Sequence, residues 1–317
     1  MKRLFRDVAG PCLAPRGSVV CIGAFDGVHR GHRAVIDHVR ERADALNLDA
    51  VAVSFDPIPR VFFARDAVVP QLTSAAEKIG RLIDAGIGRV LLLRFNAAMA
   101  AMSAEDFIAR VLVSRLCARE VWVGENFRFG HARRGDPALL KRIGETERFT
   151  AKSIETVIAD GECISSSRIR KLLAESDFAT ANGLLGRSFT IGGHVVLGQQ
   201  LGRKLGYPTA NLRLGSRVSP VQGIFAVRVH GVSDRPMPSV ASLGMRPTVN
   251  GKEPLLEAHL FDFSGDLYGK KIQVEFVEKL RDEEKFDSLD AMVQQIHRDA
   301  AQAREILGCV ETPVFNP

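Results

Sequence analysis

Apolar runs in the first half of the chain alternate with segments whose apolar residues recur every three or four positions. Runs typical of buried strands cover residues 18–23, 50–55, 89–93 and 120–124. Helical patterns between them cover residues 31–46, 74–85 and 104–116. Strands that alternate with helices are typical of a parallel sheet covered on both faces. The first half is therefore predicted to be a doubly wound α/β domain.

The pattern changes near residue 184. Short apolar segments separated by Gly, Pro and Asn follow, at residues 194–197, 224–229, 255–260 and 272–277. Close turns without intervening helices predict an antiparallel barrel or sandwich. Residues 288–307 return to a helical period and are predicted to pack on the strands before them. We therefore predict two domains, residues 1–184 and 185–317.

Composition agrees with a globular protein of this organisation. The 317 residues are enough for two cores, and 46% hydrophobic with 25% charged residues excludes wholesale disorder. No apolar run reaches the roughly 18 residues of a membrane span. The charged start, from Met1 to Asp7, is unlike a secretory signal. A cytoplasmic protein without a membrane partner is expected.

The cysteines and the net charge each restrict the chemistry. Five scattered cysteines without a CxxC pair predict reduced, mostly buried thiols rather than a disulfide framework or a zinc site. The net charge of +6 fits either a mildly basic surface or a preference for polyanionic substrates such as nucleotides. No block of Lys and Arg and no aromatic-basic stripe is present, which argues against a nucleic-acid partner.

Residues 23–32, GAFDGVHRGH, join the first predicted strand to the first predicted helix. Ligands bind at the carboxyl ends of the strands in an open parallel sheet, and the free N–H groups of a helix start attract anions. His29 and His32 are three positions apart, so both can face the same side of a helix start and donate to phosphate oxygens. Glycines at positions 23, 27 and 31 allow the backbone to approach a ligand.

Two other segments suit phosphate groups. Residues 164–170, ISSSRIR, run hydroxyl side chains into a helix, which is either an ordinary N-cap or an anion site that Arg168 completes. Residues 198–211 place glycines among basic residues and can cradle phosphates, although they lack the ending of a Walker loop. A plain β-turn is the default interpretation of that loop taken alone.

Taken together, these segments resemble a known family. Residues 23–32 are similar to the HxGH motif of the nucleotidylyltransferase superfamily, in the form seen in the bacterial bifunctional riboflavin kinase/FAD synthetase family. Residues 164–170 resemble the second motif of that superfamily, and Pro208-Thr209-Ala210-Asn211 resembles the signature of riboflavin kinases. The resemblance spans roughly residues 18–307. It implies a Rossmann-like α/β domain followed by a β-barrel with a C-terminal helix.

For the first domain the resemblance implies adenylyl transfer, in which the FMN phosphate attacks the α-phosphorus of ATP and releases pyrophosphate. It assigns transition-state stabilisation to His29, His32 and Arg168, with Mg²⁺ shared among the phosphates. Contacts to the nucleotide are assigned to Gly23, Phe25, Asp26, Gly27, Gly31, Ser165, Ser166 and Ser167. Asn126 and Phe127, in a GENFRFG segment, are assigned to the flavin. Ala24 stands where the family often has Asn, which removes one side-chain hydrogen bond.

For the second domain the resemblance implies phosphorylation of riboflavin to FMN by ATP. Thr209 and Asn211 would hold Mg²⁺ and the phosphates, with Gly198 and Arg203 near the nucleotide. Glu257 would accept the proton of the riboflavin 5′-hydroxyl, and Arg281 and Phe286 would lie against the flavin. From the residues alone, Glu257 fits the solvent face of a strand equally well, because it alternates with Leu256 and Ala258.

Two other hypotheses remain beside the bifunctional enzyme, whose substrates would be riboflavin, FMN and ATP. One is a single-activity enzyme with one inert module, and Ala24 makes the adenylyltransferase the module at risk. The other is a basic nucleic-acid-binding protein that keeps the folds without the chemistry. The sequence leaves open the oligomeric state, the passage of FMN between sites, and the reversibility or redox dependence of FAD synthesis.

Overall fold

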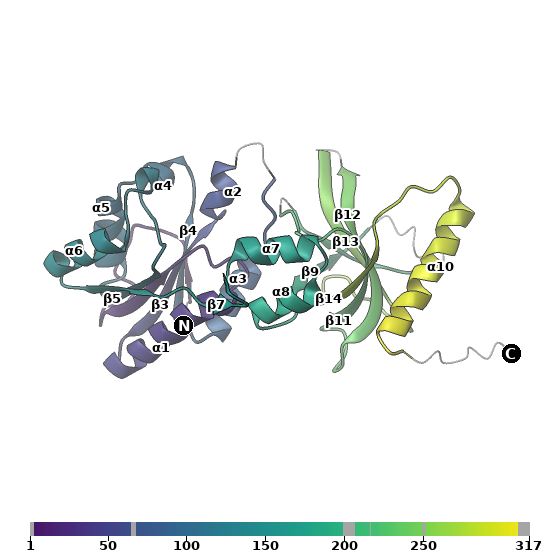
Figure 1. The fold of residues 1–317 in the computed structure, drawn as a ribbon, viewed down its shortest axis with the longest axis horizontal. Coiled ribbons are helices and arrows are strands. Elements are labelled where there is room, and N and C mark those ends of the chain that lie inside the picture. The colour runs from purple at the N-terminus through teal and green to yellow at the C-terminus, as the bar shows by residue number, and fades with distance from the viewer. Residues whose placement is uncertain (1–2, 65–67, 199–206, 216, 249–250, 310–317) are drawn as a thin grey trace. The chain divides into compact units, whose positions relative to one another are not determined.

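A computed structural model describes residues 3–64, 68–198, 207–215, 217–248 and 251–309 of the chain. The chain divides into two compact units, Met1–Ser166 and Ser167–Pro317 (Figure 1). Arg203, one of the predicted nucleotide contacts, lies outside the described residues. Among the helices described, none is long and apolar enough to cross a membrane.

The first unit is built on a parallel sheet of six strands in the order β1-β4-β3-β2-β5-β6. The strands are β1 (Leu4–Phe5), β2 (Ser18–Ile22), β3 (Asp49–Asp56), β4 (Arg89–Arg94), β5 (Ala118–Gly124) and β6 (Thr150–Ile154). A small antiparallel pair, β7 (Ile158–Ala159) and β8 (Glu162–Cys163), follows it. The central strands are near-continuous apolar runs because both of their faces are covered.

Helices lie on both faces of this sheet (Figure 1). The helices of this unit are α1 (Arg30–Leu46), α2 (Pro59–Phe63), α3 (Ala75–Asp84), α4 (Ala97–Ala101), α5 (Ala104–Phe107), the π-helix η1 (Ile108–Arg115), the short 3₁₀-helix η2 (His131–Arg133) and α6 (Pro137–Glu147).

Alternate residues of each strand enter different cores. Val20 of β2 packs in one core with residues of η1 and α6, whereas its neighbours Val19 and Cys21 pack in the other core with residues of α1 and α3. This division follows from the two-residue period of a strand. The predicted doubly wound α/β architecture is confirmed.

The second unit is a closed antiparallel barrel in the order β10-β13-β12-β11-β14-β9. The strands are β9 (Thr190–Val196), β10 (Ala210–Arg213), β11 (Gly223–His230), β12 (Met237–Thr248), β13 (Gly251–Leu260) and β14 (Lys271–Arg281). Helices α7 (Ser166–Ala174) and α8 (Phe178–Leu185) precede it, and α10 (Leu289–Ile306) follows it.

Two helices of this unit pack on the barrel. Phe178 of α8 contacts the rings of Phe225 and Phe276, at centroid distances of 6.1 and 6.2 Å. Small side chains of α10, Ala300 and Ala303, pack against barrel residues in a separate cluster. The predicted barrel with its C-terminal helix is therefore confirmed. The helix α8 was not predicted, because near residue 184 the sequence indicated only the change from the α/β pattern to the β pattern.

The prediction for the cysteines is wrong in two respects. Cys12 and Cys117, 105 residues apart, form a disulfide, and of the remaining three only Cys21 is buried, where burial raises its pKa to about 12. The N-terminal segment runs along the end of η1, where the Leu13 N–H donates to the Arg115 carbonyl at 2.8 Å. That long-range pairing brings the two sulfur atoms together, and spacing along the chain does not reveal it.

The packing of Phe276 in the barrel core leads to a prediction about the stability of the barrel. Phe276 is 1% exposed and contacts the rings of Phe225 and Phe189 at centroid distances of 5.1 and 5.6 Å. We expect Phe276→Ala to lower the free energy of unfolding of the barrel by about 3–5 kcal/mol, because it leaves a cavity that the fold closes only in part. Calorimetry measures the change. Leu289→Ala, at a side chain 55% exposed, is the control and is expected to cost less than about 0.5 kcal/mol. An equal effect of both would contradict this view of the core.

Candidate active sites

The loop after β2 and the loop after β5 meet at the point where the strand order of the sheet reverses. From β2 the chain crosses over to β3 on one side, and β5 pairs with β2 on its other side. Crossovers that leave in opposite directions open a crevice at the carboxyl ends of the two strands, and ligands of open α/β sheets bind there. Residues 23–32 and 124–130 are thus brought to one edge of the sheet, as the two predicted segments require.

Buried hydrogen bonds fix the backbone of the first loop. Phe25, Gly27 and Val28 adopt positive φ angles of 47°, 88° and 43°. Asp26 is 2% exposed, and its carboxylate accepts from the backbone N–H groups of Leu72 and Thr73 at 3.0 Å. Left-handed conformations at non-glycine residues persist only where the surroundings hold them. Asp26 therefore anchors the loop through hydrogen bonds of its carboxylate within the protein.

The two histidines lie at the start of α1, as the spacing predicts. Their rings stack with centroids 3.6 Å apart and 17° between planes. His29 is the N-cap, 5% exposed, and its Nδ1 accepts from the His32 N–H at 3.3 Å. A ring whose Nδ1 accepts carries its proton on Nε2 in the neutral form. A Cβ at Gly31 would lie 3.2 Å from this Nδ1, so a side chain there would crowd the His29 ring.

The second predicted motif adjoins the first loop. The Ser166 hydroxyl donates to the Asp26 carbonyl at 2.9 Å, and the Ile164 carbonyl lies 3.4 Å from the position a Cβ would take on Gly31. Ser165 is half-buried beside them. Ser167 and Arg168 occupy the first turn of α7 and belong to the second compact unit.

Sequence reasoning missed a buried cation beneath the first loop, Lys78 of α3. It is 3% exposed, and its Nζ donates to the carbonyls of Ala24 at 3.1 Å and Phe55 at 2.7 Å. Burial lowers its pKa to about 8, against the opposing effect of the Asp26 and Asp56 charges. The capping box of Ser74 and Glu77 fixes the start of α3 just before it. In the sequence, a lysine directly after the capping-box pattern S-x-x-E does not by itself indicate a functional residue. The hydrogen bond of Lys78 to the Ala24 carbonyl is what connects it to the first loop.

Ala24 itself, where the resembled family often has Asn, is held through its backbone. Its carbonyl accepts from both the Ser54 hydroxyl and the Lys78 ammonium, each at 3.1 Å. The position of the loop therefore does not depend on a side chain at residue 24.

The two predicted flavin residues of this unit differ in exposure. Phe127 is half-buried, stacks on Phe129 with centroids 5.5 Å apart, and packs on the core through it. Asn126 is exposed in the turn that the Phe127 N–H closes onto the Gly124 carbonyl at 3.0 Å. An aromatic face and an adjacent amide are thus presented at the carboxyl end of β5.

In the barrel, Asn211 of β10 and Glu257 of β13 are direct cross-strand partners. Paired residues of neighbouring strands face the same side. Asn211 is 5% exposed and its Nδ2 donates to the Thr209 carbonyl at 3.2 Å. Its Oδ1 is buried without a hydrogen-bond partner among the residues described. A Cβ at Gly198 would lie 2.6 Å from the same amide, so Gly198 leaves the space around Asn211 open.

The other predicted flavin segment is held by ion pairs. Arg281, at the end of β14, donates to the Asp299 carboxylate from Nη2 at 2.7 Å, and its guanidinium lies 5.7 Å from the Phe286 ring centroid. Glu284 approaches the same guanidinium at 3.3 Å. Arg281 and Phe286 are therefore brought together, with the charge of Arg281 balanced within the protein.

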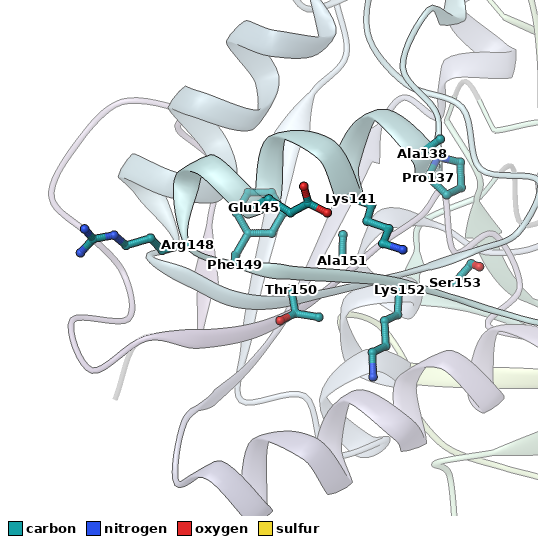
Figure 2. Close-up of a pocket in the computed structure, with 11 residues that line it drawn as sticks. Pro137, Ala138, Lys141, Glu145, Arg148, Phe149, Thr150, Ala151, Lys152 and Ser153 are labelled. Atoms are coloured by element: carbon teal, nitrogen blue, oxygen red, sulfur yellow. The ribbon is translucent and has the colours of Figure 1, made fainter.

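A surface groove of about 780 Å³ lies elsewhere, between α6 and the outer strand β6 (Figure 2). Lys141, Arg148 and Lys152 line it together with Glu145. None of the predicted site residues lines this groove, so its chemistry is separate from that of the two sites above.

Comparison with known proteins assigns a family to each domain. The family model for FAD synthetase matches residues 13–168, and the model for riboflavin kinase matches residues 185–307. A protein of Escherichia coli strain K12 described as bifunctional riboflavin kinase/FMN adenylyltransferase is 43% identical over 307 residues, 96% of this chain and 98% of that protein. A Pseudomonas fluorescens protein of the same description is 42% identical over 292 residues, 92% and 93% of the two chains.

A solved structure shares the whole architecture. The crystal structure of a protein described as a macrolide-efflux protein from Streptococcus pneumoniae has a TM-score of 0.75 and 29% sequence identity, covering 94% of this chain and 96% of that chain.

A parallel α/β domain that matches the FAD synthetase model, followed by a β-barrel that matches the riboflavin kinase model, defines a two-domain nucleotide-dependent transferase. The chain belongs to the family of bifunctional riboflavin kinases/FMN adenylyltransferases. It is an enzyme whose FAD synthetase domain precedes its riboflavin kinase domain, and its substrates are riboflavin, FMN and ATP.

The lowered pKa of Lys78 predicts that the free energy of unfolding depends on pH. Its pKa falls from the ordinary 10.5 to about 8 in the folded protein, so between these pH values the unfolded chain binds more protons. The free energy of unfolding of the wild type is therefore expected to rise with pH relative to Lys78→Met, by on the order of 2–3 kcal/mol between pH 7.5 and 10. Urea unfolding followed by the fluorescence of Trp122, the single tryptophan, measures the difference.

The exposed Lys141 supplies the matched control. Lys141→Met is expected to follow the wild type across the same pH range. A difference between wild type and Lys78→Met that does not change with pH would contradict a lowered pKa at Lys78.

Proposed function

We propose that His29, His32 and Arg168 stabilise the transition state in which FMN is adenylylated. The stacked pair of histidines at the N-terminus of α1 carries this proposal. Nε2–H of His29 and the ring of His32 would donate to the phosphate oxygens as charge moves to the leaving pyrophosphate, and the dipole of α1 would add to their effect. Arg168 would pair with the triphosphate as a bidentate donor.

The reaction needs no nucleophile from the protein. An oxygen of the FMN phosphate forms a bond to the α-phosphorus of ATP, and the bond from that phosphorus to the oxygen it shares with the β-phosphorus breaks. The protein aligns the two phosphates and stabilises the charge. Backbone groups of Gly23, Phe25, Gly27 and Gly31 and the hydroxyls of residues 165–167 would contact the nucleotide. Asn126 and Phe127 would contact the flavin.

For the barrel we propose that Glu257 is the general base of riboflavin phosphorylation. Its cross-strand pairing with Asn211 supports the assignment, because a base and a phosphate ligand are then placed on one face of two adjacent strands. Glu257 would accept the proton of the riboflavin 5′-hydroxyl while that oxygen bonds to the γ-phosphorus and ADP leaves. Arg281 and Phe286 would border the flavin, and Gly198 and Arg203 would lie near the phosphates.

We propose Mg²⁺ as the divalent metal of the kinase site. The buried, unpartnered Oδ1 of Asn211 fits such an ion, because a buried carbonyl oxygen without a hydrogen bond is costly and Mg²⁺ prefers oxygen ligands. Thr209 would supply a second oxygen. When bound there, Mg²⁺ would offset the negative charge of the ATP phosphates.

The boundary between the two catalytic modules is proposed at residues 184 and 185. The riboflavin kinase match begins at residue 185, and α7 carries Arg168, which we assign to adenylyl transfer. Helices α7 and α8 thus belong to the first module by function, although the second compact unit includes them. A cytoplasmic location is also proposed. It is supported by ATP as the co-substrate of both reactions.

Separate loss of the two activities tests the assignments. We expect His29→Ala to lower the kcat for FAD formation by about 10²–10³-fold, the usual effect of removing one transition-state donor, and to leave FMN formation intact. We expect Glu257→Ala to lower the kcat for FMN formation by about 10²–10⁴-fold and to leave FAD formation from supplied FMN intact. Chromatography of flavins after incubation with ATP and Mg²⁺ measures both.

Glu257→Gln keeps the shape of the side chain without its basicity and is expected to behave as Glu257→Ala does. The loss of both activities in any one of these variants would contradict two independent sites.

The metal assignment predicts a shifted Mg²⁺ requirement. Asn211→Leu preserves the shape of the side chain but removes its oxygen, so the Mg²⁺ concentration that gives half-maximal riboflavin phosphorylation is expected to rise about tenfold or more. A titration with Mg²⁺ at fixed ATP measures this. Ser239→Ala changes another buried polar residue of the barrel, 0% exposed, and is expected to leave the requirement unchanged. An unchanged requirement in Asn211→Leu would exclude Asn211 as a ligand.

A further inference from the structure

Tyr207, the second residue before Thr209, links residues 207–211, called the nucleotide segment below, to the C-terminal helix α10. Its hydroxyl forms a hydrogen bond with Nδ1 of His297 in α10, 90 residues away, and the two rings contact each other with centroids 5.2 Å apart. Tyr207 also packs on the apolar cluster that joins α10 to the barrel. The segment is therefore tied to α10 by both a polar and an apolar contact.

His259 supports the same segment from the barrel side. Its Nδ1 lies 2.9 Å from the Pro208 carbonyl, and its ring contacts that of Tyr207 at a centroid distance of 4.9 Å. Burial lowers the pKa of His259, which favours the neutral ring, and Nδ1 is the donor because the Pro208 carbonyl can only accept. His259 lies two positions after Glu257 on β13 and therefore on the same face of that strand. The nucleotide segment is thus clamped between β13 and α10.

Helix α10 also contacts the predicted flavin residue Arg281, through Asp299, which is two positions after His297. Asp299, 5% exposed, accepts from Nε of Arg281 at 2.9 Å and from Nη2 at 2.7 Å, and Gln295 adds a hydrogen bond at 2.8 Å. A buried carboxylate with these partners is a rigid anchor. One helix therefore contacts both of the substrate segments of the kinase site.

We propose that Tyr207 and His297 are positioning residues for ATP in riboflavin phosphorylation. The inference rests on the proposed roles of Thr209 and Asn211. The hydrogen bond to His297 fixes the backbone just before Thr209, so that the threonine hydroxyl and the Asn211 carbonyl oxygen are held in place before the nucleotide binds. Because α10 also anchors Arg281, the nucleotide segment and the flavin segment share one rigid support.

The test is the kinetics of riboflavin phosphorylation in variants of this contact. Tyr207→Phe removes only the hydroxyl, and His297→Leu removes only the ring nitrogens and their bonds. Each is expected to raise the KM for ATP about fivefold and to leave kcat and the KM for riboflavin within about twofold. The double variant is expected to match the single variants, since both lose the same bond. His297→Asn, which places an amide oxygen near the lost Nδ1, is expected to restore part of the ATP affinity.

Asp262→Asn supplies the matched control. It weakens the ion pair of Asp262 with Arg304, 2.9 Å, which also joins α10 to the barrel, and leaves the hydrogen bond of Tyr207 with His297 in place. An unchanged KM for ATP is expected there. An equal rise in Asp262→Asn, additive effects in the double variant, or an unchanged KM in Tyr207→Phe would overturn the inference.

FAD formation from supplied FMN reports on the other site and is expected to be unchanged in all of these variants. Full kinase activity in Glu257→Ala, or an unshifted Mg²⁺ requirement in Asn211→Leu, would contradict the proposed kinase site. The effect of Tyr207→Phe on the KM for ATP would be unaffected by either result. The two failures are therefore distinguishable.

Discussion

The carboxylate of Asp26 holds the first site together. It is buried, it binds backbone N–H groups from a segment more than forty residues further along the chain, and it lies in the field of the buried Lys78 ammonium. A buried carboxylate without such donors would be strongly destabilising, so its partners must remain in place whenever the domain is folded. The strained backbone of Phe25 and Val28 lies on either side of this anchor, and the histidine pair begins at the next residue, His29.

The second site depends on strand register rather than on a buried charge. Asn211 faces Glu257 because β10 and β13 pair in one register, and a shift by one residue would turn one of the two side chains to the other face of the barrel. Closure of the barrel and its filled core fix that register. A small β-barrel thus places the proposed metal ligand and the proposed base on neighbouring strands, while α10 contacts both Tyr207 and Arg281.

Much of this arrangement could be predicted from the sequence, because its signals are local. The period of the apolar residues gave the parallel sheet, and the three-residue spacing of His29 and His32 gave their common face. The resemblance joined residues 164–170 to the first loop, and the hydrogen bond between Ser166 and Asp26 agrees with it.

The features that sequence reasoning missed are long-range pairings. The disulfide between Cys12 and Cys117, the hydrogen bond of Lys78 to Ala24 and that of Tyr207 to His297 each join residues far apart in the chain. A periodic pattern describes which face of an element is buried, but not which partner covers it. The anchoring of Asp26 was missed for the same reason, since its partners Leu72 and Thr73 lie in a segment without a distinctive pattern.

The two units differ in whether their sheets have free edges. This difference bears on the groove beside β6. The barrel closes on itself, whereas β6 is an outer strand that pairs with β5 among the residues described. An open strand edge invites a second chain to extend the sheet. Lys141, Arg148 and Lys152 line the groove beside β6 together with Glu145. The cations there outnumber the single carboxylate, so like charges would oppose the approach of a second copy along β6.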